Sequence, residues 1–179
     1  VIVGDFVQNA PEDQALQYVA GYACLNDLSA RELQFDIQPA QTTFAKSMDG
    51  FCPFGPWLVT ADEVPDPHNL QVKLWVNGAL KQNFNTSDMA HKIPRCIEWM
   101  TSIHDLEPGD VLATGTNHRG LSAFQDGDRV ELECQGMGRL VVGIRDDLKR
   151  TWARETRLER EEKGLKGTTP QLTGKYAKA

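Results

Sequence analysis

The sequence predicts a β-rich α+β domain. Short segments with the alternation typical of strands recur along the 179 residues, and glycine, proline and asparagine turns separate them. Only two or three segments have the spacing of apolar residues that a helix requires. The length suits one domain of roughly 100–200 residues with a sizeable core.

The first helix is expected after Pro11. Proline fits the first helical turn, and the acidic residues Glu12 and Asp13 favour a helix N-terminus. The helical pattern continues to Val19, and we expect Gly21 to end the helix and to let a strand begin.

The strand that begins at Gly21 leads to the most informative part of the chain. Read with a period of two, Ala23, Leu25 and Asp27 share one face, so Asp27 ends a row of otherwise apolar positions. An ionised carboxylate at the edge of an apolar face is costly unless a cation, a metal or several hydrogen-bond donors meet it. Asp27 therefore needs a partner.

The segment after Asp27 predicts a new helical turn. Ser29 and Glu32 have the Ser-x-x-Glu spacing of a capping box, in which both side chains bond backbone N–H groups. The turn places Arg31 and Gln34, three residues apart, on the same side. Together with Asp27 they can hold a cation and bind an acid. From spacing alone, a strand-end aspartate neutralised by Arg31 is at least as good an interpretation.

Lys46 stands between apolar neighbours in a stretch with few regular signals. Its ammonium group could hold a substrate carboxylate, or burial could lower its pKa. Most lysines in such a context are solvated, so the residues alone favour an ordinary surface lysine.

The middle of the chain predicts three strands and a helix. A strand is expected at residues 57–60, and residues 70–76 show the clearest alternation. Asn77-Gly78 calls for a type I′ hairpin into residues 79–82. A helix is expected around residues 91–103, with its apolar positions in the core.

The next predicted strand, at residues 111–114, runs into Gly115 and Thr116. A glycine beside a strand end lets a ligand approach the backbone closely. Thr116 would then supply a hydroxyl and an N–H group to a carboxylate oxygen. The alternative is a capped strand end without a ligand.

The last part of the chain predicts a hairpin and a charged tail. Strands are expected at residues 129–134 and 139–144, and Glu131 and Glu133 share the face opposite the apolar positions. We therefore expect these two carboxylates to point to solvent and not to bind a metal. Residues 146–179 carry many charges of both signs, which predicts a solvated helix and an extended tail, either frayed or laid across another subunit.

The composition excludes several classes of partner. The net charge is −6 and no long basic stripe is present, which argues against a nucleic-acid partner. No apolar run approaches the ~20 residues needed to cross a bilayer, so no membrane partner is expected. The four cysteines lie far apart without Cys-x-x-Cys spacing. Reduced thiols and a cytoplasmic location fit this pattern.

Five sequence blocks, in the same order, resemble the fumarylacetoacetate hydrolase family. They are GYACLNDLSARELQ (21–34), FAKSMDGFCPFGPWLVTADEVPDP (44–67), VNGALKQNFNTSDM (76–89), LEPGDVLATGT (106–116) and DGDRVELECQGMGRL (126–140). Asn-Asp-x-Ser-Ala-Arg followed by Lys-Ser and Gly-Pro-Trp is far more specific than any one short motif. The resemblance implies a mixed β-roll or sandwich fold and a homodimer. It also implies a catalytic domain at residues 1–145 and a C-terminal helix and tail at residues 146–179.

The resemblance also implies a site. Asp27 is expected to bind the metal, Mg²⁺ or Mn²⁺, since carboxylate oxygens select hard cations. Lys46 is expected to face the metal-bound substrate as the catalytic lysine. Arg31, Gln34 and Thr116 are expected to orient the acid groups of a small keto-acid substrate.

Part of the family's site is expected outside this stretch. In the family, a Glu-x-Glu pair completes the metal site and a His/Glu pair activates water, and both would precede Val1, where the chain opens as if within a strand. The chain also departs from the family at residues 117–120, where many relatives carry a proline and glycine loop. His118 and Arg119 either recognise an acidic substrate tail or belong to the loop of a subgroup.

The activity implied by the resemblance is a metal-dependent hydrolase that cleaves a carbon–carbon bond. Its substrate would be a β-diketo acid, an acylpyruvate or a fumarylacetoacetate-like molecule, and the bond would break through a metal-stabilised enolate. One alternative is an isomerase or decarboxylase of a hydroxy-dienoate diacid or of oxaloacetate on the same metal site. Another is a relative that binds a small acid without turnover.

Overall fold

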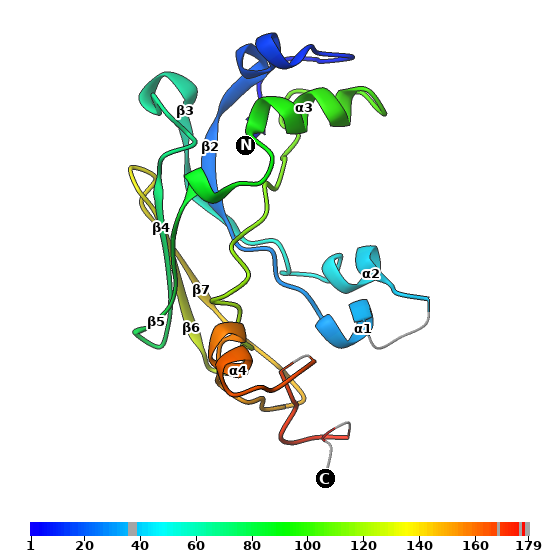
Figure 1. The fold of residues 1–179 in the computed structure, drawn as a ribbon, viewed down its shortest axis with the longest axis vertical. Coiled ribbons are helices and arrows are strands. Elements are labelled where there is room, and N and C mark those ends of the chain that lie inside the picture. The colour runs from blue at the N-terminus through cyan, green and yellow to red at the C-terminus, as the bar shows by residue number, and fades with distance from the viewer. Residues whose placement is uncertain (36–38, 168, 176, 178–179) are drawn as a thin grey trace.

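The computed structural model describes residues 1–35, 39–167, 169–175 and 177, and its strands form two antiparallel sheets (Figure 1). The first sheet has the order β1–β2–β3, with the strands Ile2–Val3, Val19–Leu25 and Phe54–Thr60. The second has the order β5–β4–β6–β7, with the strands Ala79–Asn85, Gln71–Val76, Arg129–Cys134 and Arg139–Gly143. The sheets meet where β2 contacts β6 and β7 and where β3 contacts β7. This architecture confirms the predicted β-rich α+β class.

The helices are short and lie outside the sheets (Figure 1). The helices α1 and α2 pack together as a small lobe to one side, and α3 packs on η1 at the N-terminal end of the molecule. The α-helices are Arg31–Phe35 (α1), Thr42–Lys46 (α2), Ile93–Thr101 (α3) and Arg157–Glu162 (α4). The 3₁₀ helices are Glu12–Tyr18 (η1), Ala61–Glu63 (η2) and Thr86–Asp88 (η3).

One buried cluster joins both sheets to α3. It contains Tyr22 of β2, Val130 and Leu132 of β6, and Ile93 and Ile97 of α3. The alternation of buried and less buried residues along β6 is the expected pattern for a strand with one face in the core. Within the part of the chain that the structure describes, no helix combines the length and apolar character needed to span a membrane.

The first helix is shorter than the sequence predicts. It is a 3₁₀ helix that ends at Tyr18, and β2 begins at Val19, so Gly21 lies inside the strand and does not end the helix. A Cβ atom at Gly21 would lie 2.2 Å from the carbonyl oxygen of Val59 on β3. Gly21 is therefore required for the close approach of β2 and β3.

The predicted strand at residues 111–114 does not form. Val111 makes a single bridge to Ile2, and the N–H group of Leu112 donates to the carbonyl oxygen of Val1 at 2.9 Å. Since β1 contains only two residues, it offers no ladder along which a longer strand could pair. Elsewhere the predicted hairpin is confirmed, because Asn77 and Gly78 both have positive φ angles, 50° and 80°.

The carboxylates of Glu131 and Glu133 bond to arginine and do not stand free in solvent. Two nitrogens of Arg139 donate to Glu133, at 2.9 and 2.6 Å, and Glu131 accepts from Arg129 at 3.3 Å. The side chain of Glu131 is only 17% exposed. These ion pairs give both carboxylates a structural role on the outer face of β6.

Candidate active site

Asp27 and Lys46 form the centre of the candidate site. Asp27 follows two residues after the end of β2, and Lys46 is the last residue of α2. The ammonium group of Lys46 donates to a carboxylate oxygen of Asp27 and, at 2.8 Å, to the hydroxyl oxygen of Ser29. Two predicted site residues that lie nineteen positions apart in the sequence are thus brought into direct contact.

Backbone hydrogen bonds hold the segment around Asp27 in place. The N–H group of Leu28 donates to the carbonyl oxygen of Phe51 at 2.9 Å, and that of Ala30 donates to Ala45 at 2.9 Å. The second bond links the start of α1 to the end of α2. The bond therefore couples the position of Asp27, which precedes α1, to that of Lys46 at the end of α2.

The predicted capping box does not form. The hydroxyl of Ser29 accepts from Lys46, and the carboxylate of Glu32 accepts from the indole N–H of Trp152 at 3.2 Å. A charged ammonium donor is a stronger partner for a hydroxyl than a backbone N–H group. Ser29 is therefore a member of the site that its sequence context had indicated only as a helix cap.

The ion pair between Asp27 and Lys46 is accessible. The side chains are 47% and 31% exposed, and ion pairs of this kind add little to stability. An ammonium group has three donors, of which Asp27 and Ser29 use two. Among the described residues, the other carboxylate oxygen of Asp27 has no hydrogen-bond partner. Both charged groups thus keep bonding capacity for a ligand.

Arg31 lies half-buried beside this pair. Burial lowers the pKa of Arg31, the charge of Arg157 lowers it further, and the carboxylate of Asp27 opposes both effects. Its guanidinium carbon lies 5.6 Å from the ring centre of Phe35. In the described part of the chain, no carboxylate lies within ion-pair distance of Arg31. A half-buried cation without a close counter-ion is suited to binding an acid.

Gln34 and Asn26 each contain a buried polar atom that lacks a partner among the described residues. These atoms are Gln34 Oε1 and Asn26 Nδ2. A buried donor or acceptor without a partner costs about 1–3 kcal/mol, so such groups are usually satisfied by water, an ion or a ligand. Gln34 was predicted to bind substrate, and Asn26 precedes the predicted metal ligand Asp27.

His118 lies close to three cations. Burial lowers the pKa of His118, and the charges of Arg31, Arg157 and Lys46 lower it further. The Nδ1 atom of His118 is 3.4 Å from a guanidinium nitrogen of Arg157. The loop that departs from the family's usual pattern thus reaches the site, and it brings with it an arginine from the C-terminal segment that no sequence signal had indicated.

Thr116 makes its contact elsewhere. Its hydroxyl donates to Gln82 Oε1 at 3.3 Å, and Gln82 Nε2 donates to the carbonyl oxygen of Asn117, also at 3.3 Å. These bonds attach the residue to β5 and not to the group formed by Asp27 and Lys46. Its role in binding substrate stays a prediction.

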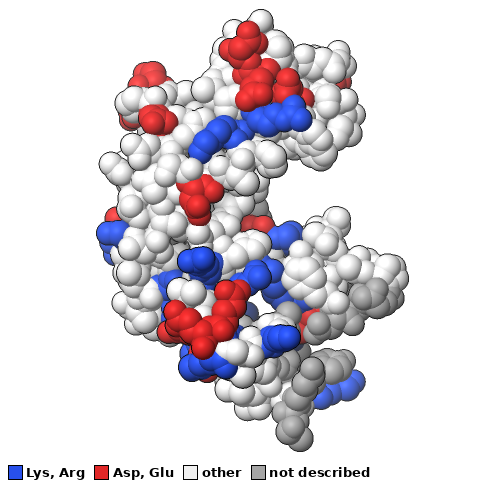
Figure 2. All heavy atoms as spheres, in the orientation of Figure 1, with Lys and Arg blue, Asp and Glu red and all other residues white. Residues whose placement is uncertain are grey.

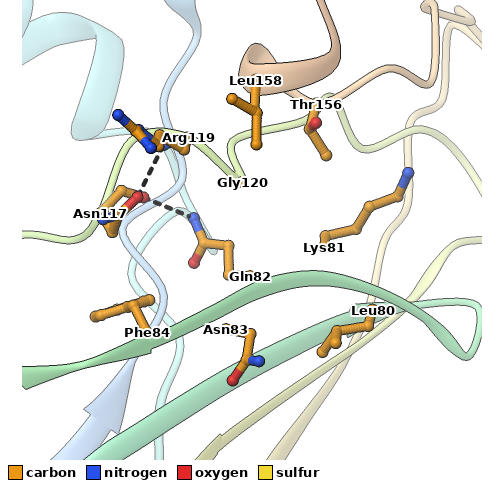
Figure 3. A pocket seen from close by; sticks show the side chains of 10 residues that line it. All are labelled: Leu80, Lys81, Gln82, Asn83, Phe84, Asn117, Arg119, Gly120, Thr156 and Leu158. Carbon is orange, nitrogen blue, oxygen red and sulfur yellow. Dashed lines mark hydrogen bonds between the residues drawn. The ribbon is translucent and has the colours of Figure 1, made fainter.

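A cavity of about 390 Å³ lies between β5, the 117–120 loop and the start of α4 (Figure 3). Arg119 and Lys81 line it from different sides, and Leu158 lies above them in this view. Gly120 lies so close to β5 that a Cβ atom there would be 2.2 Å from the carbonyl oxygen of Lys81. Asp27 and Lys46 do not line this cavity. On the face shown in Figure 2, several basic side chains gather where the α1–α2 lobe approaches the rest of the molecule.

The described residues contain no complete metal site. No three His, Cys, Asp or Glu side chains gather closely enough to hold an ion within residues 1–35, 39–167, 169–175 and 177. Asp27 nevertheless fits a hard divalent cation, because its accessible carboxylate has an oxygen without a partner in that same part of the chain.

The fold and the site together define a β-rich domain that carries its charged groups on short helices and loops beside two antiparallel sheets. The chain belongs to the fumarylacetoacetate hydrolase family: a model of the C-terminal domain of fumarylacetoacetate (FAA) hydrolase matches residues 1–145. This finding confirms the resemblance inferred from the five sequence blocks.

Relatives of known name include enzymes of different reaction types. The chain is 42% identical over 145 residues to the 4-hydroxyphenylacetate degradation bifunctional isomerase/decarboxylase of Salmonella dublin, covering 80% of this chain and 33% of that protein. It is 37% identical over 145 residues to the maleylpyruvate hydrolase of Aquipseudomonas alcaligenes, covering 81% and 48%. The chain thus spans between a third and a half of the length of these relatives.

Solved structures of relatives have the same fold. The maleylpyruvate hydrolase of Sphingobium sp. SYK-6, in complex with manganese(II) ion and pyruvate, is 38% identical with a TM-score of 0.73, and the match covers 80% of this chain and 51% of that one. The 2-hydroxyhepta-2,4-diene-1,7-dioate isomerase of Mycobacterium marinum is 34% identical with a TM-score of 0.72, covering 82% and 56%. The predicted family fold is therefore confirmed.

Proposed function

We propose that this chain carries the catalytic domain, at residues 1–145, of a metal-dependent hydrolase that cleaves a carbon–carbon bond of a β-diketo acid. The substrate class is an acylpyruvate or a fumarylacetoacetate-like molecule. The observation that carries the proposal is the accessible pair of Asp27 and Lys46 beside the half-buried guanidinium of Arg31. Membership of the family, and a relative named as a maleylpyruvate hydrolase, support this reaction class.

We assign Asp27 as one ligand of a divalent ion, Mg²⁺ or Mn²⁺. The manganese(II) ion in the related maleylpyruvate hydrolase structure supports a divalent metal. We propose that the remaining protein ligands come from residues outside the 179 of this sequence. The greater length of the relatives is consistent with this proposal. When bound, the ion would supply Lewis-acid stabilisation to the negative charge that develops on the substrate's oxygens.

The side chains around Asp27 bind and orient the acid. The guanidinium of Arg31 binds a substrate carboxylate, and Gln34 Oε1 accepts a hydrogen bond from a substrate hydroxyl, which satisfies an otherwise unpaired buried acceptor. The third N–H of Lys46 donates to the carbonyl oxygen that becomes negative when water attacks. Thr116 is assigned to a carboxylate oxygen, since its 3.3 Å bond to Gln82 is long for a hydroxyl donor and is readily exchanged.

Two other functions use the same residues. An isomerase or decarboxylase of a hydroxy-dienoate diacid or of oxaloacetate is favoured by the bifunctional isomerase/decarboxylase relative. Binding of a small acid without turnover is favoured by a different observation. In the described part of the chain, no two further metal-binding side chains gather with Asp27. The hydrolase differs from both in its need for a base that activates water.

Assays of the complete protein loaded with Mn²⁺ separate these functions. A hydrolase consumes an acylpyruvate with loss of enol absorbance and release of pyruvate and a second acid. A decarboxylase instead releases CO₂ from oxaloacetate, and an isomerase changes the absorbance of a hydroxy-dienoate without changing its mass. Binding of pyruvate without any of these changes would overturn the proposal and leave the binding function.

We also propose that the protein is a cytoplasmic homodimer. Its four cysteines are free, which suits a reducing compartment. The edge strand β3 exposes large apolar side chains, with Phe54 at 53%, Trp57 at 58% and Leu58 at 44%. An exposed apolar edge strand favours pairing with another chain.

A further inference from the structure

The C-terminal segment from residue 146 onward lies beyond the range matched by the family, yet it packs against the candidate site. The N–H group of Arg157 donates to the carbonyl oxygen of Leu121 at 2.7 Å, and that of Leu158 donates to Arg119 at 2.8 Å. The indole of Trp152 donates to Glu32 on α1. The segment thus contacts both the 117–121 loop and the helix that carries Arg31 and Gln34.

Buried polar contacts hold this segment in place. The buried carboxylate of Asp128 accepts from two nitrogens of Arg154, at 2.6 and 2.9 Å, and from Asn77 at 2.9 Å. Thr156 and Glu159 form a complete capping box at the start of α4. Most of α4 is exposed, as expected for a solvated helix, but its N-cap residue Thr156 and, one turn later, Arg160 are buried.

The anchored segment brings Arg157 to the cations of the site. Its Nε atom donates to Glu161 at 2.9 Å, and Nη1 lies 3.4 Å from His118 Nδ1. A guanidinium has five N–H donors, so these contacts leave others available. The charge of Arg157 also lowers the pKa of both Arg31 and His118, which is consistent with its closeness to them.

We propose that Arg157, together with His118, forms a second acid-binding subsite that makes this protein prefer substrates with two carboxylates. The inference rests on the proposed function, in which Arg31 binds the first carboxylate. The ion pair of Arg157 with Glu161 is about half exposed and is therefore weak, so the N–H donors that it leaves free can bind a second acid group while Arg31 binds the first. The C-terminal segment is, on this proposal, the element that determines substrate specificity.

The test compares dicarboxylates and monocarboxylates in the wild type and in Arg157→Gln. With a 2,4-dioxo diacid, the substitution is expected to raise KM about tenfold, the change expected from loss of one charge-assisted hydrogen bond. With a 2,4-dioxo monoacid, KM is expected to change less than about twofold, because the second subsite is then not used. Arg157→Lys, which keeps the charge, is expected to recover part of the loss.

Arg145→Gln is the matched control. Arg145 is 83% exposed, pairs with Asp147 and lies outside the site, so it is expected to leave both KM values unchanged. An equal rise of KM for the diacid and the monoacid in Arg157→Gln would overturn the proposal, as would no rise for either. Melting temperatures of all variants show whether the fold is kept. If Arg157→Gln unfolds, the same comparison of diacid and monoacid is made with Arg157→Lys.

Calorimetry separates this inference from the proposed function. Glutarate and butyrate, which cannot react, are titrated into the complete protein loaded with Mn²⁺. Tighter binding of glutarate in the wild type, and its loss in Arg157→Gln, supports the second subsite even where no β-diketo acid is turned over. Equal affinity for glutarate and butyrate in the wild type would exclude the subsite whatever the reaction.

Discussion

Lys46 and Asp27 form an ion pair across nineteen residues of sequence, from the end of one short helix to a loop after a strand. The two side chains remain 31% and 47% exposed. A pair this open contributes little to folding, and both charged groups stay accessible to the ligand that we propose they bind.

Lys46→Met is expected to lower kcat about 10²–10³-fold, because the donor that stabilises the developing oxyanion is lost. Stability is expected to change by less than about 1 kcal/mol. Steady-state kinetics and chemical denaturation measure the two effects. Lys149→Met is the matched control, since Lys149 also pairs with an aspartate, Asp126, at 2.7 Å. A variant of Lys46 that unfolds more easily but keeps its kcat would contradict the assignment.

Asp27→Asn is expected to weaken Mn²⁺ binding to the complete protein by at least about tenfold, since an ionised oxygen ligand is replaced by a neutral one. Isothermal titration calorimetry measures the affinity. Asp147→Asn, at a side chain that is 75% exposed, is expected to bind Mn²⁺ as the wild type does. Unchanged affinity in Asp27→Asn would remove this residue from the metal site.

Asp128 is expected to make stability depend on acid pH. Burial alone would raise the pKa of Asp128, but hydrogen bonds from Arg154, the N–H of Gln125 and Asn77 outweigh it and hold the pKa below its usual value. The folded state then binds the proton less readily than the unfolded state. The stabilisation is fully present above about pH 4, the ordinary pKa of the group, and is lost as the pH falls through the lower folded pKa.

Asp128→Asn tests this dependence. The variant is expected to lose about 2–4 kcal/mol at pH 7, towards the lower value because Arg154 stays partly solvated at 41% exposure. Urea denaturation from pH 7 to pH 2 is the measurement. The gap between wild type and variant is expected to narrow below about pH 4. A gap that stays constant down to pH 2 would show that Asp128 does not titrate in this way.

Trp57→Lys is expected to convert the proposed dimer into a monomer, because a charge on the exposed edge strand β3 opposes chain-to-chain pairing. Light scattering coupled to size-exclusion chromatography measures the mass. Trp99→Lys is the matched control, since Trp57 and Trp99 are equally exposed, at 58%, and Trp99 lies on α3. Loss of the dimer in the Trp99 variant alone would place the interface at α3.

The sequence was sufficient to predict much of the fold where periodicity was clear. The strand at β4, the type I′ hairpin at Asn77-Gly78 and the hairpin of β6 and β7 were all predicted from alternation and turn residues. It was not sufficient where pairing depends on a distant partner. Val111 lacks a strand because β1 is short, and Gly21 lies inside a strand because of its contact with Val59.

The candidate site was predictable in its parts but not in its contacts. The contact between Asp27 and Lys46 depends on how α1 packs on α2, which no local pattern encodes. For the same reason the hydroxyl of Ser29 was interpreted as a helix cap. Arg157 lies in a stretch where most side chains are charged, so composition could not single it out. Its importance follows only from the position at which the C-terminal segment packs.

Gly120 has no side chain, yet it sets how closely the loop that holds His118 approaches β5. Its backbone rests on the carbonyl oxygen of Lys81, where even a methyl group would be too large. An alanine there would push the loop away from β5 and carry the imidazole of His118 away from its neighbours. A residue without a side chain thus controls the distance between His118 and Arg157. At this residue the backbone of the loop leaves room for glycine alone, the smallest amino acid.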